Sequence, residues 1–533
     1  MPRASALCMA GMICAVVLAA GCASLPPGSD YPKLPSAAIQ ASATTRLGGA
    51  FDAAARAHPG QSGFRLLSVG VDGFLARAQM IDAAERTLDL EYFIFRQDAT
   101  GQLLTAALLR AADRGVRVRV LVDDGDTLDG DERLVALGAH PNIEIRIFNP
   151  FVYRGHLLAM RAFEFMLDSG RLDYRMHNKL MVVDNAVALI GGRNIADAYF
   201  QVDPDSQYGD DDVFAAGPVV GRLSNTFDLF WNSSLAIPAR ALAGGAPAAA
   251  ELVAYRQQLD SQPQTLQDDG KHFAQRLAAG DPLAGILAAR LPLVWAHAEL
   301  VYDSPDKKRV ESGEMIGKLM HRAVAKVAAA TQSELILVSP YFIPGDSGMR
   351  LLAGLRARGV RVRVLTNSLE ATTETEAHSG YMHYRRALLE DGVELFEVRA
   401  LLGSPHGSGE SRATARTTDY ALHAKLFVFD RRKVYVGSMN FDERSHHLNT
   451  EIGLIIDSPE LASQTAARFE AIVVPQNCYR VTLDADRPGG PTHLAWHTVE
   501  DGQPVVYGEE PARDALQRMK VLFLTMLPLD GEL

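Results

Sequence analysis

The sequence predicts an α/β protein built from two similar domains. A spaced pattern occurs twice along its 533 residues, with every interval between the named positions preserved. The first copy is His177-x-Lys179, Asp184, Gly191-Gly192-x-Asn194; the second is His423-x-Lys425, Asp430, Gly437-Ser438-x-Asn440. The segments before the two copies also resemble each other, and strand patterns alternate there with amphipathic helix patterns. A chain of this length accommodates two such domains, each with a core of its own.

The duplication extends upstream of both motifs. Each series has a Tyr-Phe-Ile triplet, then a helical stretch, then an apolar strand that alternates Val with Arg. The first series is Tyr92–Ile94, Leu103–Arg114 and Gly115–Leu121; the second is Tyr341–Ile343, Leu351–Arg358 and Gly359–Leu365. We therefore expect two whole domains of similar fold rather than two grafted loops.

Each motif is predicted to form a β-hairpin. Two apolar runs flank a polar pair in both copies: Leu180–Val183 and Ala186–Ile190 flank Asp184-Asn185, and Leu426–Phe429 and Val434–Val436 flank Asp430-Arg431. Each motif aspartate then lies at a turn, where Asp commonly accepts hydrogen bonds from nearby backbone. We favour this structural role for Asp184 and Asp430, although both belong to the motif that we take as the catalytic set.

The histidine and lysine of each motif suggest phosphodiester chemistry. Side chains two residues apart on a strand point the same way, so each motif presents an imidazole and a cation together. A neutral imidazole can attack phosphorus, and a second imidazole can act as general acid and base. Lysines can stabilise the phosphoryl oxygens. Together His177, Lys179, His423 and Lys425 supply one nucleophile, one acid/base and two cations.

A metal site is the main alternative for these histidines, and we disfavour it. A protonated lysine is not a ligand, and no cysteine or second histidine lies at ligand spacing in either motif. We therefore predict neither a metal nor a cofactor. Gly191, Gly192 and Gly437 either allow tight backbone geometry or let backbone N–H groups approach a phosphate, and the sequence leaves both open.

With these residues in place, the chain resembles the phospholipase D superfamily, which is defined by paired HKD motifs, and most closely its bacterial cardiolipin synthases of the C type. The resemblance runs from about residue 60 to the C-terminus. Three further segments support it: Asn149-Pro150-Phe151, Arg175–Lys179 and Asn440–Ser445. It implies that each domain is an α/β/α sandwich with a mixed sheet, and that the two domains face each other and share one active site.

The resemblance also assigns roles. It implies His177 as the nucleophile and His423 as the acid/base. The superfamily pairs each histidine with a downstream carboxylate; this matches Glu451 in the second repeat, and we select Asp212 from Asp210–Asp212 in the first. Asn194, Asn440 and Ser438 are expected to support or contact the phosphate. Gly192 stands where a serine is commoner, so the contact expected from Ser438 has no counterpart there.

We divide the chain into six segments. They are a signal peptide (1–22), an N-terminal linker (23–60), a first domain (61–240), an Ala- and Gln-rich insertion (241–290), a second domain (291–475) and a C-terminal extension (476–533). A loop from Gly403 to Thr418 is rich in Ser, Gly, Thr and Arg; its Arg412 and Arg416 could touch a head group, although solvated charge is the favoured interpretation.

The N-terminus predicts export. Arg3 precedes an apolar run from Leu7 to Ala20 that is too short for a permanent membrane span. Leu18–Cys22 resembles a bacterial lipobox, with Ala19 where Leu is usual, so we expect Cys22 to be acylated and the protein to be anchored on the periplasmic side of the cell envelope; an ordinary cleaved signal is the alternative. Cys478 would remain a single buried thiol.

Composition and motifs together indicate the function. A net charge of −11 disfavours a nucleic-acid-binding protein. We predict a membrane-associated phosphatidyltransferase that makes cardiolipin from phosphatidylglycerol and a second phospholipid, with phosphatidylethanolamine as the other candidate substrate. The alternatives are a phospholipase D or other phosphodiesterase that uses water, and a non-catalytic phospholipid-binding lipoprotein. The segment from Phe151 to Phe165 could dip into a bilayer; core packing is the competing interpretation.

Overall fold

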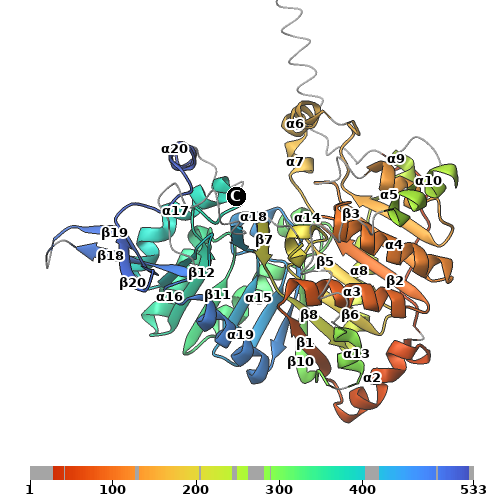
Figure 1. The fold of residues 1–533 in the computed structure, drawn as a ribbon, viewed down its shortest axis with the longest axis horizontal. Helices are drawn as coiled ribbons and strands as arrows, with labels where there is room; N and C mark the ends of the chain where they lie inside the picture. Colours follow the sequence, from red (N-terminus) through yellow and green to blue (C-terminus); the bar gives the residue numbers. More distant parts are fainter. Residues whose placement is uncertain are drawn as a thin grey trace, which may run out of the picture.

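Two mixed β-sheets with helices on both faces form the centre of the computed structural model (Figure 1). The structure describes residues 28–526 apart from 41, 126–130, 156, 203–205, 243–248, 262–280, 289, 403–418, 486 and 488–489. The predicted signal peptide, Cys22 and the loop 403–418 therefore lie outside the described residues. Within the described part, no helix combines the length and the apolar character needed to cross a membrane.

Seven strands of the first domain have a counterpart in the second. The first domain contains β1 (Ser62–Leu67), β2 (Thr87–Tyr92), β3 (Arg117–Asp123), β4 (Ile143–Phe148), β5 (Lys179–Val183), β6 (Val187–Gly191), β8 (Asp212–Ala216) and β9 (Ala236–Pro238). The second contains β10 (Val294–Tyr302), β11 (Glu334–Val338), β12 (Arg361–Asn367), β13 (Glu394–Val398), β15 (Leu426–Phe429), β16 (Lys433–Gly437) and β17 (Ile452–Asp457). Strand β9, which pairs with β4, is matched by β18 (Cys478–Ala485) of the C-terminal segment, which pairs with β13.

Both sheets have the same topology. The order β1-β8-β6-β5-β2-β3-β4 in the first domain is repeated as β10-β17-β16-β15-β11-β12-β13 in the second. In each sheet the last three strands are parallel and the other pairs are antiparallel. The predicted fold of two similar α/β domains with mixed sheets is confirmed, including both motif hairpins.

The two sheets are joined edge to edge. Strand β1 pairs antiparallel with the start of β10, where Ser62–Phe64 oppose Val294–Ala296, while the rest of β10 pairs with β17. Because β10 belongs to both ladders, backbone hydrogen bonding continues from one domain into the next. A two-stranded parallel sheet of β7 (Ser206–Gly209) and β14 (Asp419–Leu422) forms a second connection.

Helices cover the sheets according to the alternation of side chains along the strands. On the outer faces lie α3 (Gly70–Ala83), α4 (Ala99–Asp113) and α5 (Asp131–Leu137) in the first domain, and α15 (Met320–Ala329), α16 (Gly345–Ala357) and α17 (Thr375–Glu390) in the second. On the inner faces lie α8 (Pro218–Trp231) and α19 (Pro459–Ile472). Helix α4 begins before the predicted Leu103 because Asp98 caps it by accepting a hydrogen bond from Gly101 N–H at 3.2 Å.

The inner faces share one hydrophobic core. Val182 of β5 and Trp231 of α8 belong to the same buried cluster as Val428 of β15 and Phe469 of α19. Burial of a large apolar side chain contributes about 1.5–3 kcal/mol. The interface between the domains is therefore packed like the interior of a single domain. This packing fixes the position of the two domains, and of the side chains at the edge of the interface, relative to each other.

Three segments outside the predicted domains add to them. The predicted linker contains α2 (Arg46–Ala57), whose Leu47 and Phe51 are buried in the first core. The predicted insertion contributes α10 (Ala249–Asp260) and α13 (Pro282–Leu287), which pack on α4, α5 and α3. The predicted C-terminal extension continues the second sheet with β18 (Cys478–Ala485), β19 (Thr492–Glu500) and β20 (Gln503–Tyr507), and ends in α20 (Ala515–Leu524).

Both motif aspartates hold the turns of their hairpins. Asp184 and Asp430 have φ of 54° and 53°, in the left-handed region that a two-residue hairpin turn requires. The carboxylate of Asp184 accepts hydrogen bonds from the backbone N–H groups of Glu85, Arg86 and Thr87 at 3.0, 2.7 and 2.9 Å. Asp430 accepts from Gln332, Ser333 and Glu334 in the same way. Each aspartate therefore fixes the start of a neighbouring parallel strand.

The Asp184→Ala substitution should destabilise the protein. It leaves three backbone donors of a fully buried site without their acceptor, and hydrogen bonds to a charged group are worth about 1.5–3 kcal/mol. Asp430→Ala provides the matched control, because that carboxylate is only partly buried and water can replace it. Thermal unfolding should show the larger fall in Tm for Asp184→Ala, and an equal fall in both variants would contradict the explanation.

Candidate active site

His177 and His423 line one cavity between the two domains. The cavity has a volume of about 450 Å³, and Tyr199, Tyr208 and Asn440 are among its other lining residues. One histidine precedes β5 and the other precedes β15, so equivalent ends of equivalent strands meet there. Asp184 and Asp430 lie beyond the opposite ends of these strands, roughly 17 Å along a five-residue strand. The structure thus removes both aspartates from the catalytic set.

The second domain positions His177. The backbone N–H of His177 donates to Thr450 O at 2.9 Å, beside an isolated bridge between Met176 and Thr450. Its Nδ1 lies 2.9 and 3.0 Å from the two carboxylate oxygens of Glu451. Phe93 packs against the ring edge-on, at 5.1 Å between centroids. With Nδ1 occupied, Nε2 is the nitrogen left for chemistry.

The first domain positions His423. The backbone N–H groups of His423 and Ala424 both donate to Gly209 O, at 2.8 and 3.0 Å. The His423 Nδ1 lies 2.6 Å from Asp210 Oδ2. Tyr208 stacks on the ring and Tyr199 meets it edge-on, with the Tyr199 hydroxyl 3.5 Å from Nε2. Each histidine is therefore held by backbone and carboxylate groups of the opposite domain.

This arrangement corrects the selection of Asp212 as a histidine partner. Asp212 is fully buried, and its carboxylate forms ion pairs with Arg77 at 2.8 Å and Arg193 at 3.1 Å. The residue that contacts the histidine is Asp210, and the histidine is the one of the other motif. Likewise Glu451 pairs with His177 rather than with His423 of its own repeat.

Strand register explains the correction. Gly191 pairs with Asp212 and Gly437 pairs with Gly453, so Asp212 is the counterpart of Gly453. Glu451 and Asp210 each precede these positions by two residues and are therefore equivalent to each other. The equivalence of Asp210 and Glu451 is hard to see in the sequence. The segment between the motif asparagine and the carboxylate is longer in the first repeat than in the second, so counting residues from the motif does not align the two carboxylates.

Ser438 supports Glu451 instead of facing a phosphate. Its Oγ donates to Glu451 Oε2 at 2.5 Å, and Ser445 Oγ donates to Oε1 at 2.8 Å. At the equivalent position a Cβ on Gly192 would collide with the Asp210 carboxylate. The glycine thus makes room for the shorter aspartate, which explains why the two motifs differ there.

The two motif lysines are buried beneath the histidines. Lys179 Nζ donates to His177 O at 2.7 Å, and Lys425 Nζ donates to His423 O at 2.5 Å. Burial lowers the pKa of Lys179 well below its usual value, against the opposing effect of Glu451, and lowers the pKa of Lys425 to about 8. Both amines are therefore weakly solvated, and an anionic ligand in the cavity would favour their charged forms.

Electrostatics favour uncharged imidazoles. Burial, followed by the nearby lysines, lowers the pKa of His177 and His423 well below 6.5. Burial also raises the pKa of Glu451 to about 7 and that of Asp210 to about 6. Each histidine–carboxylate pair can then share a proton on the Nδ1 side, which leaves an Nε2 lone pair; at His423, Lys425 Nζ lies 2.8 Å from Nδ1 and 3.1 Å from Nε2 and can donate to that lone pair.

The two motif asparagines differ in how they are used. Asn194 is buried and fully engaged, because Oδ1 accepts from Ile94 N–H at 3.1 Å and Nδ2 donates to the Tyr199 hydroxyl at 2.9 Å. It therefore positions the tyrosine beside His423. Asn440 also lines the cavity, and its buried Oδ1 has no partner among the described residues.

Several residues of the cavity were not selected from the sequence. They include Tyr199, Tyr208, Arg96 and Arg444, which line the cavity, and Asp210, which contacts His423. Three of them lay within recognisable segments, since Arg96 follows the duplicated Tyr-Phe-Ile triplet, Arg444 belongs to Asn440–Ser445 and Asp210 belongs to Asp210–Asp212. The tyrosines had no such signal: η3 (Asp197–Phe200) follows the first motif as α18 (Glu443–His447) follows the second, but Ser445 stands where Tyr199 does, and Tyr208 lies on β7.

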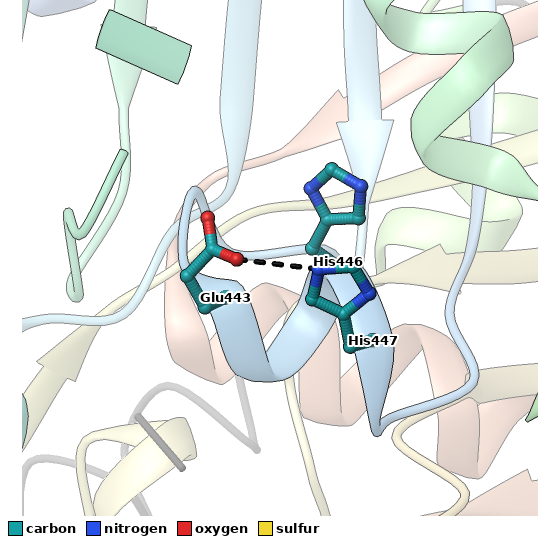
Figure 2. Close-up of side chains that lie close together, drawn as sticks. All are labelled: Glu443, His446 and His447. Carbon is teal, nitrogen blue, oxygen red and sulfur yellow. Dashed lines mark ion pairs between the residues drawn. The ribbon is translucent and has the colours of Figure 1, made fainter. Parts of the chain in front are cut away.

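A separate group of potential ligands lies on α18 (Glu443–His447), next to the cavity (Figure 2). His447 pairs with Glu443 one helical turn away, at 3.3 Å. The ring of His446 lies between those of His447, which is stacked on it with centroids 4.3 Å apart, and His321, which is tilted against it at 4.0 Å. An ion pair and ring contacts within the protein therefore account for the geometry of this group.

Comparison with known proteins identifies the family. The model described as "Cardiolipin synthase, PLD-like domain" matches residues 78–231 and again residues 324–473, which are the two structural repeats. The chain is 34% identical over 475 residues to cardiolipin synthase C of Escherichia coli, covering 89% of this chain and 96% of that protein. The chain belongs to this family. The predicted phospholipase D-type phosphatidyltransferase is thereby confirmed at the level of the family.

Two further comparisons agree. An uncharacterized protein of Helicobacter pylori is 30% identical over 463 residues, covering 86% of this chain and 87% of its own. The crystal structure of phosphatidylserine synthase from Haemophilus influenzae is similar with a TM-score of 0.51 at 13% identity, covering 81% of this chain and 92% of that one. The second likeness supports the fold alone.

The substitutions Asp210→Asn and Asp212→Asn should have different effects, because Asp210 orients a motif histidine whereas Asp212 neutralises buried arginines. Asn at 210 cannot hold His423 in the same tautomer, so turnover of a phosphodiester substrate should fall roughly 10³–10⁴-fold with little change in Tm. Asn at 212 removes the counter-charge of two buried arginines and should destabilise the fold by about 3–5 kcal/mol. Turnover is measured per folded protein and stability by thermal unfolding. A stability loss in Asp210→Asn with normal turnover, or a turnover loss in Asp212→Asn with normal stability, would contradict this account.

The buried Glu91 of β2, which contacts the first motif through Asn178, should make the stability of the folded protein depend on pH. It accepts a hydrogen bond from Asn178 Nδ2 at 2.8 Å, and burial raises its pKa from 4.5 to about 8. Between these pH values the folded chain holds a proton that the unfolded chain has lost, so stability falls as pH rises through that window. Glu91→Gln should therefore raise Tm by about 2 °C or more at pH 8 and much less at pH 5. A shift that is independent of pH would refute this explanation.

Proposed function

We propose that this protein is a membrane-associated phosphatidyltransferase that makes cardiolipin from phosphatidylglycerol and a second phospholipid, through a phosphohistidine at His177. One observation carries the proposal. Two imidazoles from duplicated motifs line the same cavity, and each has its Nδ1 held by a carboxylate of the opposite domain. Both Nε2 atoms are thereby directed away from their carboxylates, as an in-line displacement with separate nucleophile and acid/base requires.

In the first step His177 Nε2 attacks the phosphorus of one phospholipid. A bond from nitrogen to phosphorus forms, the phosphorus–oxygen bond to the head-group alcohol breaks, and His423 Nε2 protonates the departing oxygen. A negatively charged phosphodiester next to His423 raises the pKa that burial and Lys425 lower, so the ring can carry this proton when substrate is bound. Lys179 and Lys425 stabilise the charge on the phosphoryl oxygens.

In the second step the acceptor alcohol attacks the phosphohistidine. His423 removes its proton, the new phosphorus–oxygen bond forms and the bond to His177 breaks, which restores both rings. When the acceptor is a hydroxyl of phosphatidylglycerol the product is cardiolipin; when it is water the product is phosphatidic acid. Phosphatidylglycerol and phosphatidylethanolamine are the donors that we propose, and the name of the Escherichia coli relative supports the first product.

We also propose that the protein acts outside the cytoplasm. The run Leu7–Ala20 and the lipobox-like Leu18–Cys22 support export and acylation of Cys22. Acylation would hold the active-site cavity close to phospholipid, and a mass spectrum of the mature N-terminus would reveal either the acylated Cys22 or another residue.

The two histidines should fail differently when replaced. Purified protein is incubated with labelled phosphatidylglycerol vesicles, with and without phosphatidylethanolamine, and lipids are resolved by mass spectrometry. His177→Ala should lose turnover by at least roughly 10³-fold and form no covalent intermediate, whereas His423→Ala should lose turnover but retain a trapped phosphoenzyme with an activated substrate.

The products decide the acceptor. Cardiolipin from the unaltered protein establishes transfer, and its dependence on phosphatidylethanolamine names the second lipid; phosphatidic acid alone would make the enzyme a hydrolase. Turnover retained in either histidine variant would overturn the two-histidine mechanism. Asp430→Ala is a suitable control, since its side chain lies at a distant turn.

A further inference from the structure

Helix α6 (Leu158–Leu167) has the reverse of the usual distribution of side chains. Its only buried residue is Arg161, while its large apolar residues are exposed. Leu158, Met166 and Leu167 are 69%, 72% and 68% exposed, and Phe163 is 51% exposed. Soluble proteins rarely expose contiguous apolar patches of this kind unless another surface covers them. The core-packing interpretation of Phe163 and Phe165 is therefore wrong.

Helix α20 (Ala515–Leu524) in the second domain has the same character. Val521 is its only buried side chain, whereas Leu516, Met519 and Phe523 are 70%, 62% and 62% exposed. Figure 1 shows α6 and α20 at the same edge of the molecule, one on each domain, with α18 and β7 between them. The chain thus presents two apolar helices on either side of elements that line the active-site cavity.

Both helices are attached to the rim of that cavity. Lys520 of α20 forms a 2.9 Å ion pair with Glu376, which lines the cavity. Arg161 of α6 donates to Asp124 O and Oδ1, next to Asp123, whose carboxylate accepts from Met176 N–H just before His177. A surface that receives both helices would therefore lie across the cavity mouth.

The charge of the two helices differs from that of the whole protein. The chain carries a net charge of −11, yet α20 contains two basic residues and no acidic one, and the one acidic residue of α6, Glu164, accepts hydrogen bonds from Val152 and Tyr153 N–H. This local balance avoids repulsion from anionic lipid head groups. It is compatible with a phospholipid bilayer, which also contains the substrate that the proposed function requires.

From these observations we infer that α6 and α20 form a two-point docking surface that seats the cavity mouth on a phospholipid bilayer. The inference rests on the proposed function, because it supplies the route by which an insoluble substrate enters the cavity. The exposed apolar side chains insert at the level of the head groups, and the polar cavity mouth between them faces the lipid surface.

Hydrogen–deuterium exchange on the full chain tests the surface directly. Adding vesicles of palmitoyl-oleoyl phosphatidylglycerol and phosphatidylethanolamine should lower deuterium uptake in peptides that cover α6 and α20, and leave α10 and α16 unchanged. Uptake unchanged in both helices would overturn the inference. Protection that appears without vesicles and grows with protein concentration would also overturn it, by showing that a second copy covers the surface.

Substitutions then separate docking from chemistry. Phe163→Ser/Met166→Ser and Leu516→Ser/Phe523→Ser should each lower kcat/KM on vesicles by roughly tenfold or more, through lost apolar burial. Activity on monomeric dihexanoyl phosphatidylglycerol should be unchanged. Leu229→Ser/Ile316→Ser, which removes exposed apolar side chains elsewhere, is the matched control. All variants share one N-terminus, so any anchor there contributes equally.

The two hypotheses fail in distinguishable ways. If the unaltered protein produces neither cardiolipin nor phosphatidic acid from the short-chain lipid, the proposed function fails. If it is active and the helix variants match the control on vesicles, only the docking surface fails.

Discussion

The exchange of support between the two domains is the constraint on which the active site depends. His177 reaches Glu451 and Thr450 of the second domain, and His423 reaches Asp210 and Gly209 of the first. Neither domain alone can hold its own histidine in position. The shared core and the pairing of β1 with β10 are therefore part of the site, because any change in the angle between the domains would separate both imidazoles from their carboxylates at once.

Burial sets the chemistry of this constellation. Two imidazoles, two lysines and two carboxylates are enclosed together, and burial moves the pKa of every one of them toward the uncharged form. Isolated ions would be costly in such a place. An anionic phosphodiester would favour the charged forms of both lysines, so the site is organised for a ligand with a negative charge. The same burial keeps both imidazoles neutral near physiological pH.

Much of this could be predicted from the sequence, for a definite physical reason. Hairpins, strand parity and the duplicated order of elements are local features, and residues such as Leu180–Val183 and Asp184 specify them within a few positions. The partners of the histidines are not local. The family resemblance led to the selection of Asp212, while the register of β6 against β8 makes Asp210 the equivalent of Glu451. Only the packing of one domain on the other reveals that the partners are exchanged. The tyrosines around His423 could not be found by comparing the repeats, because Ser445 stands in the second repeat where Tyr199 stands in the first, and only the fold brings Tyr199 and Tyr208 against His423.

That asymmetry bears on which histidine does what. Around His177 a single aromatic ring, Phe93, packs on the imidazole, and Glu451 is fixed by two serine hydroxyls. Around His423 two tyrosines enclose the ring, and the Tyr199 hydroxyl, itself oriented by Asn194, lies 3.5 Å from Nε2. A hydroxyl near Nε2 suits a group that exchanges protons with an alcohol, since it can order the leaving or entering oxygen there. The surroundings of His423 therefore fit the acid/base role that we propose for it, on grounds independent of the order of the motifs in the chain.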